Sequence, residues 1–171
     1  MLTNYDAPPR QPKWLLHIQM FLLRHRLMGP FNRQFLIITT TGRKTGQKRS
    51  VPIGFIPDGD TYLVLNLGGV SNWYKNALTD PRVTLIVEGK QMNMCAEAVP
   101  VKTPEQLMPV LAAYRRERPN LFKNVFGMPP DAPQDELMKI GERVAFMRFY
   151  PVPGKSGQNG STTQGNGKDK P

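Results

Sequence analysis

Two kinds of hydrophobic pattern divide this chain, a helical one before residue 30 and a strand-like one from Phe35 onward. Apolar positions between Trp14 and Met28 predict an amphipathic helix, yet they form two stripes rather than one. The first comprises Trp14, Ile18, Phe21 and Leu22, and the second comprises Leu16, Met20, Leu23 and Leu27. One stripe should pack on its own domain, and the other on a partner subunit, an anionic membrane surface or a neighbouring loop.

From Phe35 onward, short runs of β-branched and aromatic residues alternate with turn signals. Six strands are predicted, over 35–40, 51–56, 61–66, 83–87, 92–99 and 144–150. Asp58-Gly59 and Glu88-Gly89-Lys90 are hairpin signals, so the strands beside each should pair antiparallel. Short strands joined mostly by hairpins favour an α+β fold, an antiparallel barrel with helices packed outside it.

Two further helices are predicted between the strands, each with a cap that is visible in the sequence. Their ranges and caps are 73–78 after Ser71 or Asn72, and 104–118 after Thr103. The segment 119–141 is broken by prolines and predicts no defined element.

Length and composition indicate one domain. The chain has 171 residues, of which 39% are hydrophobic, enough for a core of ordinary size. We expect this domain over 13–153, after a flexible segment over 1–12. The segment 154–171 has no residue able to bury apolar area, so nothing offsets the cost of ordering it and it should be disordered.

The single cysteine, Cys95, and the lack of a recognisable secretion signal favour a cytoplasmic protein. The predicted first helix is too short to span a bilayer, which takes about 20 apolar residues. Residues 13–28 could instead place the protein peripherally at the inner membrane face. Cys95 itself lies in an alternating strand and is expected in the core.

Positive charge gathers in the first third of the chain. Nine cations and one acidic residue lie within 1–57, so this third carries +8 of the net charge of +10. Four cations fall in the segment 39–50, where two glycines let backbone N–H groups turn toward an anion. Arg43, Lys44 and Arg49 would neutralise a phosphate or carboxylate there. The same pattern also fits a solvated hairpin turn.

Side chains typical of several reaction classes are scattered or absent. Both histidines lie in the predicted first helix, far from Cys95, so no metal site is predicted. The sequence has no nucleophile elbow, no Walker loop and no dinucleotide-binding glycine pattern. The basic segment lacks interleaved aromatic residues, so specific nucleic-acid binding is not predicted. The catalytic residues are therefore unknown, and a bound cofactor would supply the reactivity.

Three segments, 39–52, 58–69 and 72–84, carry a recognisable combination of motifs. They read Thr39-Thr-Thr-Gly-Arg-Lys-Thr-Gly-Gln-Lys-Arg-Ser-Val-Pro52, Asp58-Gly-Asp-Thr-Tyr-Leu-Val-Leu-Asn-Leu-Gly-Gly69 and Asn72-Trp-Tyr-Lys-Asn-Ala-Leu-Thr-Asp-Pro-Arg-Val-Thr84. In this order they resemble the deazaflavin-dependent nitroreductase family. The resemblance covers roughly 33–100 and implies a split β-barrel of the flavin-reductase type. It also implies hydride transfer from reduced coenzyme F420 to a small electron-poor acceptor such as a quinone or nitroaromatic.

The resemblance further implies a homodimer and a set of cofactor-binding positions. These are Arg43, Lys44, Thr45, Gly46 and Arg49 for the phosphate and acidic tail, Pro52 and Ile53 beside the ring, Asn66, Leu67, Gly68 and Gly69 along the deazaflavin, and Trp73 and Asn76 closing the pocket. The paired glycines would let the backbone approach a flat ring, and Trp73 would offer an apolar wall. The proton for the product could come from water, Tyr62 or Tyr74.

Leu67 departs from the family pattern, in which a lysine often precedes the paired glycines. This departure leaves a second hypothesis open, a non-catalytic split-barrel protein that binds FMN, haem or a fatty acid and associates with a membrane. Separate titrations with F420, FMN and haem would distinguish the two.

Overall fold

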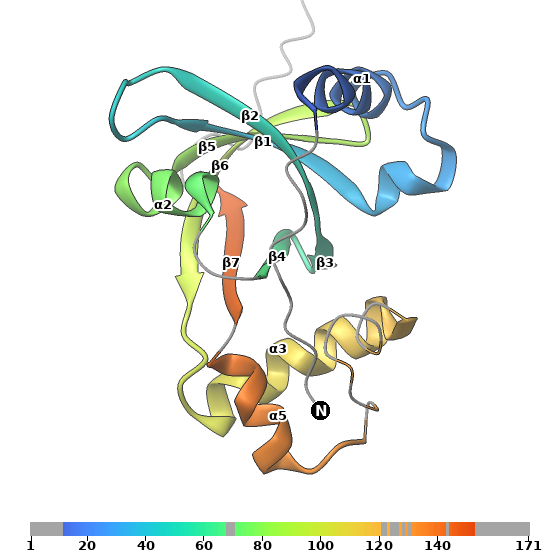
Figure 1. The fold of residues 1–171 in the computed structure, drawn as a ribbon, viewed down its shortest axis with the longest axis vertical. Helices are drawn as coiled ribbons and strands as arrows, with labels where there is room; N and C mark the ends of the chain where they lie inside the picture. The colour runs from blue at the N-terminus through green and yellow to red at the C-terminus, as the bar shows by residue number, and fades with distance from the viewer. Residues whose placement is uncertain are drawn as a thin grey trace, which may run out of the picture.

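Seven antiparallel strands and the helices packed on them make up the described part of the computed structural model, residues 12–67, 71–120, 123, 127, 129, 131–142 and 144–152 (Figure 1). The strands are β1 (Phe35–Thr41), β2 (Lys48–Gly54), β3 (Ile56–Asp58), β4 (Thr61–Leu67), β5 (Arg82–Val87), β6 (Lys90–Val99) and β7 (Val144–Pro151). The helices are α1 (Lys13–Arg24), the 3-10 helix η1 (Gly29–Arg33), α2 (Asn72–Thr79), α3 (Pro104–Glu117) and α5 (Gln134–Gly141).

Neighbouring strands follow the order β2-β1-β5-β6-β7-β4-β3, and every pair is antiparallel. The two edge strands, β2 and β3, are consecutive in the chain and separated only by Phe55. The segment 48–58 therefore passes from one edge of the sheet to the other and curls it into a barrel that is split at this bend. The predicted split antiparallel barrel with outer helices is confirmed.

The division at Phe55 corrects the single strand predicted over 51–56. The main-chain N–H of Phe55 donates to the carbonyl of Gln34 at 3.1 Å. Arg118 Nη2 donates to the carbonyls of both Gln34 (2.6 Å) and Phe55 (2.8 Å). One guanidinium thus ties the residue before β1 to the bend between β2 and β3, and seven strands replace the predicted six.

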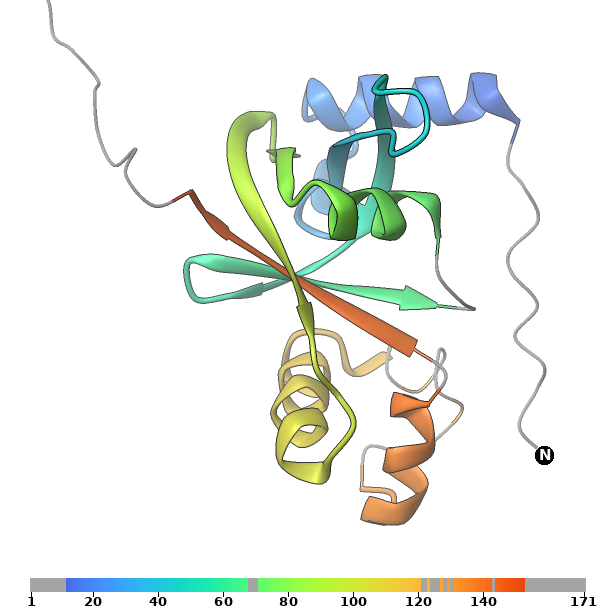
Figure 2. The same cartoon turned by 90° about the vertical axis from the view of Figure 1, so that its left-hand side faces the viewer.

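Three apolar clusters attach the helices to the sheet. Leu107, Leu111 and Tyr114 of α3, with Leu137 of α5, pack on Ile56, Leu63 and Phe146. Tyr74 and Ala77 of α2 join the barrel interior, and Leu23 of α1 packs on Ile37 and Ile86. Figure 2 shows α1 and α2 at one end of the molecule and α3 and α5 at the other, with the strands crossing between them.

The predicted hairpins and two of the predicted helices lie where the sequence places them. β3 pairs with β4 across Asp58-Gly59, and β5 with β6 across Glu88-Gly89. α2 follows Ser71, and α3 follows Thr103. The first helix ends at Arg24 rather than Met28, because the chain turns through Arg26, whose φ is 59°.

The structure differs from the sequence predictions at α5 and Cys95 and leaves the two chain ends untested. α5 lies in the segment 119–141, which predicted no element. Cys95 is half-buried on the face of β6 opposite to Met94 and Ala96, so its predicted place in the core is wrong. The expectations for 1–12 and 154–171 concern residues that, apart from Pro12, lie outside the described ones. No described helix is both long and apolar enough to cross a bilayer.

Candidate cofactor site

The predicted cationic loop is the turn between β1 and β2. The N–H of Gly42 donates to the carbonyl of Gln47 at 2.8 Å, while Thr45 and Gly46 donate to the carbonyl of Gly42 at 3.1 and 2.7 Å. Gly46 has a φ of 68°, and a Cβ on Gly42 would come within 3.1 Å of Gln47 O and Thr45 Oγ1. The backbone of Gly46 therefore favours glycine, and a side chain at Gly42 would have to displace its neighbours by a few tenths of an ångström.

Strand alternation decides which cations of the loop share one face. Thr40 lies opposite Arg49 in the register of β1 and β2, and Val51 lies two residues further on the same face of β2. Lys48 points to the other face, where its Nζ donates to Thr41 Oγ1 at 2.9 Å. Arg49 therefore joins Arg43 and Lys44 of the turn, whereas Lys48 does not.

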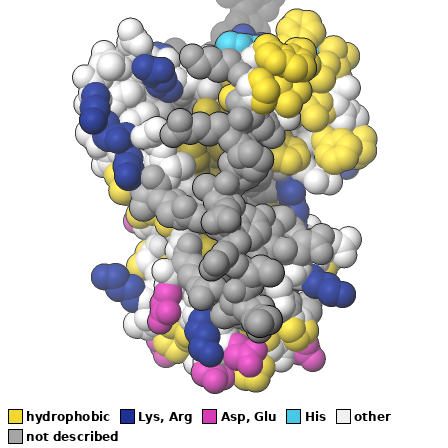
Figure 3. Space-filling view, in the orientation of Figure 1, with side chains coloured by type: hydrophobic (Ala, Val, Ile, Leu, Met, Phe, Trp, Pro, Cys, Tyr) yellow, Lys and Arg dark blue, Asp and Glu magenta, His cyan; other side chains and the backbone are white. Residues whose placement is uncertain are grey.

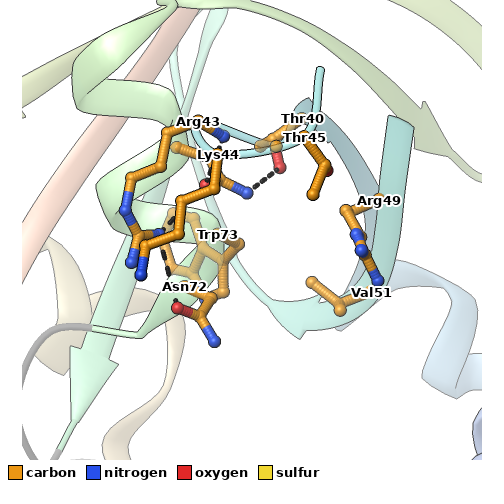
Figure 4. Close-up of a pocket in the computed structure, with 10 residues that line it drawn as sticks. Thr40, Arg43, Lys44, Thr45, Arg49, Val51, Asn72 and Trp73 are labelled. Atoms are coloured by element: carbon orange, nitrogen blue, oxygen red, sulfur yellow. Dashed lines mark hydrogen bonds between the residues drawn. The ribbon is translucent and has the colours of Figure 1, made fainter. Parts of the chain in front are cut away.

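A groove of about 430 Å³ lies between this turn and α2 (Figure 4). Its lining residues are Thr40, Gly42, Arg43, Lys44, Thr45, Arg49, Val51, Asn72, Trp73 and Asn76. Figure 4 shows Arg43 and Lys44 on one side and Arg49 on the other. Among the described residues, none of these three cations forms an ion pair with a carboxylate. The groove therefore carries uncompensated positive charge, which suits an anion.

Asn76 connects the turn to α2. Its side chain is only 5% exposed, and its Oδ1 accepts hydrogen bonds from the main-chain N–H (3.2 Å) and Nη1 (3.1 Å) of Arg43. Its Nδ2 donates to the buried Thr40 Oγ1 at 3.2 Å. Asn72 Oδ1 accepts a further bond from Arg43 Nη1 at 3.3 Å. The Arg43 side chain is thus held along α2 at the groove.

Trp73 supplies the apolar wall of the groove, together with Val51. Its half-buried indole meets the ring of Tyr74 edge-on at 5.6 Å and the ring of Phe149 at 6.5 Å. These ring contacts support the indole from the barrel interior, and its flat face forms part of the wall. Such a surface suits a planar ligand ring.

Six of the thirteen predicted cofactor positions line this groove. They are Arg43, Lys44, Thr45, Arg49, Trp73 and Asn76. Gly46 lies in the turn itself, and Ile53 packs against the barrel interior. Pro52 pairs with Ile37 on the opposite face of β2, and Asn66 is buried in β4. Leu67 is the last residue of β4, whereas Gly68 and Gly69 lie outside the described residues.

Four lining residues were absent from the prediction: Thr40, Gly42, Val51 and Asn72. Strand alternation indicates two of them. Val51 lies two residues from Arg49 and shares its face of β2, and Thr40 lies opposite Arg49 on β1. Asn72 precedes Asn76 by four residues, so the two amides share one face of α2. Alternation and helical spacing could therefore have identified three of the four.

Neither tyrosine considered as a proton donor lines the groove. The hydroxyl of Tyr74 is buried and donates to the carbonyl of Phe146 at 3.5 Å. Tyr62 packs edge-on against Phe55. Burial raises the pKa of both hydroxyls, with the charge of Glu88 adding to the effect at Tyr62. Both therefore keep their protons at neutral pH.

Within the described residues, no three His, Cys, Asp or Glu side chains gather to hold a metal ion.

Comparison with known sequences matches residues 23–122 to the F420H(2)-dependent quinone reductase family. An F420H(2)-dependent quinone reductase of Mycobacterium tuberculosis is 32% identical to the chain over 85 residues, which cover 47% of this chain and 56% of that protein. The chain thus spans about half the length of the curated relatives it matches.

Two solved structures share the fold. A haem storage protein from Vibrio cholerae has a TM-score of 0.51 at 16% identity and covers 81% of this chain and 92% of its own. A second structure, described as a domain-swapped dimer, has a TM-score of 0.50 at 17% identity and covers 80% of this chain and 97% of its own. At these identities the likeness extends to the fold alone.

Proposed function

The chain belongs to the F420H(2)-dependent quinone reductase family, and from this premise we propose that it is an oxidoreductase that binds coenzyme F420 in the groove beside Trp73. The observation that carries the proposal is the charge of that groove. Three cations that form no ion pair among the described residues line the groove on both sides, together with the indole of Trp73. An anionic coenzyme with a planar ring needs both features.

Each part of the groove has a separate task in this proposal. Arg43, Lys44 and Arg49 would hold the acidic tail, and Trp73 with Val51 would flank the ring and exclude water from it. The bound coenzyme would supply the hydride, and a quinone is the acceptor that the relative's name suggests. The chain's own contribution is placement and desolvation. Since Tyr62 and Tyr74 do not line the groove, we assign the product's proton to water.

The alternative cofactors find less support in the lining of the groove. Haem iron is usually held by His, Cys, Met or Tyr, and none of these is among the described residues that line the groove. FMN shares a flat ring and a phosphate with F420, so the groove's chemistry alone does not distinguish those two. The family match favours F420.

The function is tested by titrating the purified protein separately with F420, FMN and haem, followed by a turnover assay. We expect binding of F420, and oxidation of reduced F420 when menadione is added as the quinone. Binding of FMN or haem without F420, or a co-purified fatty acid in a protein indifferent to F420, would support the non-catalytic hypothesis instead.

The exposed stripe of α1 supports a docking role beyond catalysis. Trp14, Ile18 and Phe21 are 63%, 46% and 57% exposed, whereas Leu23 on the other stripe is 4% exposed. Leu27, which the sequence pattern placed in the same stripe as Leu23, is 62% exposed because α1 ends before it. Figure 3 shows apolar side chains gathered on the side of the molecule where α1 and η1 lie. This apolar surface needs a dry partner.

We propose that this surface rests on an anionic membrane at the inner face. Arg24 and Arg26 flank it, and no acidic residue occurs between Asp6 and Asp58. Anionic head groups would meet this charge, and aromatic side chains would enter the head-group boundary. Two copies joined through the same surface would bring their arginines together. The predicted homodimer therefore remains a separate prediction, with another contact.

Replacing Trp14 and Phe21 together by serine should weaken binding to phosphatidylglycerol-containing vesicles at least about tenfold, because two exposed aromatic side chains are lost. Vesicle sedimentation measures the effect. Leu78→Ser is the matched control, since Leu78 is 55% exposed on α2, away from α1. Unchanged vesicle binding, or loss of a dimer in light scattering by the double variant, would contradict the membrane assignment.

A further inference from the structure

The guanidinium of Arg43 is held entirely by neutral groups. Asn76 and Asn72 of α2 accept its hydrogen bonds, and no described carboxylate lies within ion-pair distance. Asn76 in turn donates to Thr40, which is fully buried in β1. The position of the guanidinium is therefore set by both the sheet and the helix, while its charge remains available.

Only one nitrogen of this guanidinium is used for these contacts. Among the described residues, the bonds to Asn72 and Asn76 both come from Nη1 of Arg43. Nε and Nη2 have no partner within the described part of the chain. These two nitrogens can bind a phosphate or carboxylate through two parallel hydrogen bonds. The amides thus orient the guanidinium without competing for its free edge.

Asn76 has no free acceptor to offer a ligand, and Thr40 takes one of the two N–H donors of its Nδ2. Its Oδ1 already accepts two hydrogen bonds from Arg43, which fills both lone pairs, and its side chain is buried. A carboxylate of the same shape could accept the same bonds, but it would cancel the charge of Arg43. An amide at position 76 can therefore orient the guanidinium of Arg43 without neutralising its charge.

We infer that Asn76 is a positioning residue, which presets Arg43 for an anionic ligand while leaving its charge uncancelled, with Asn72 as a weaker support. This inference rests on the proposed function, because it takes the acidic tail of F420 as the anion. It differs from the direct cofactor contact that the sequence resemblance implies for Asn76.

The test uses Asn76→Asp in the full chain, with F420 and inorganic pyrophosphate as separate probes in calorimetric titrations. We expect about tenfold weaker binding of both probes at low salt, because a full negative charge opposes one of three cations. The deficit should shrink as ionic strength rises, since salt screens the added charge. A purely structural role would not produce this salt dependence. Asn72→Asp should show a smaller deficit, because Asn72 is exposed.

Thermal unfolding accompanies each titration, and Asn72→Asp keeps the inference testable if Asn76→Asp fails to fold. Binding of both probes by Asn76→Asp at wild-type affinity would overturn the inference. Wild-type protein that binds pyrophosphate and not F420 would overturn the proposed function, and the pyrophosphate titration would then decide the role of Asn76. Wild-type protein that binds neither probe would overturn both.

Discussion

Replacing Arg43 and Lys44 together by alanine is expected to weaken F420 binding at least about a hundredfold. Both side chains line the groove on the same side, and neither has a carboxylate partner among the described residues. A hydrogen bond to a charged group contributes about 1.5–3 kcal/mol, and about 1.4 kcal/mol corresponds to a tenfold change in affinity. Two such contacts therefore account for the expected loss, which fluorescence titration of F420 would measure.

The matched control removes the same charge from elsewhere. Lys48 lies on the opposite face of β2, bonded to Thr41, and Lys90 is exposed at the start of β6. Lys48→Ala with Lys90→Ala should change the affinity by no more than about threefold at 0.15 M salt, where the screening length is about 8 Å. Equal losses from the two double variants would show that the overall field, and not contact in the groove, attracts the coenzyme.

Replacing Arg118 by methionine is expected to lower the free energy of unfolding by about 2–4 kcal/mol. Its Nη2 donates to the carbonyl of Gln34, just before β1, at 2.6 Å and to that of Phe55, at the bend between β2 and β3, at 2.8 Å. Methionine keeps most of the apolar stem, so the loss reports the two charge-assisted bonds rather than packing. Phe55 is buried, so its carbonyl depends on these partly buried bonds for its partners. Urea denaturation would measure the change.

Arg116→Met provides the control for this substitution. Arg116 lies two residues earlier, its side chain is 66% exposed, and among the described residues it forms an ion pair with its neighbour Glu117 alone. Exposed pairs of this kind contribute less than about 1 kcal/mol, so the variant should unfold near the wild-type midpoint. If both variants had the same stability, the bonds of Arg118 would not stabilise the bend at Phe55.

Local signals in the sequence were sufficient for most elements but not for the division at Phe55. The turn residues Asp58-Gly59 and the cap Thr103 determine the conformation of neighbouring residues. The hairpin of β3 and β4 and the start of α3 could therefore be predicted. The break at Phe55 depends on Gln34 and Arg118, which are distant in the sequence. Likewise, the covered stripe of α1 is selected by strand residues that no pattern within the helix reveals.

The candidate site divides in the same way. Its cations were predictable, because glycines and charges within a single turn are read directly from the chain. Asn76 was identified through a resemblance, but its hydrogen bonds to Arg43 and Thr40 connect three separate elements. These hydrogen bonds change the role inferred for Asn76 from a cofactor contact to a residue that positions Arg43. They are visible only in the folded structure.

The place of β7 in the sheet has a consequence for synthesis on the ribosome. β7 lies between β4 and β6, and it is the last strand of the described chain to be made. Until residues 144–151 emerge, both neighbours expose an unpaired backbone edge, to which other nascent chains could add. Premature termination before this strand should therefore yield aggregates rather than a smaller folded protein, and chaperones that shield strand edges should raise the yield of the full chain.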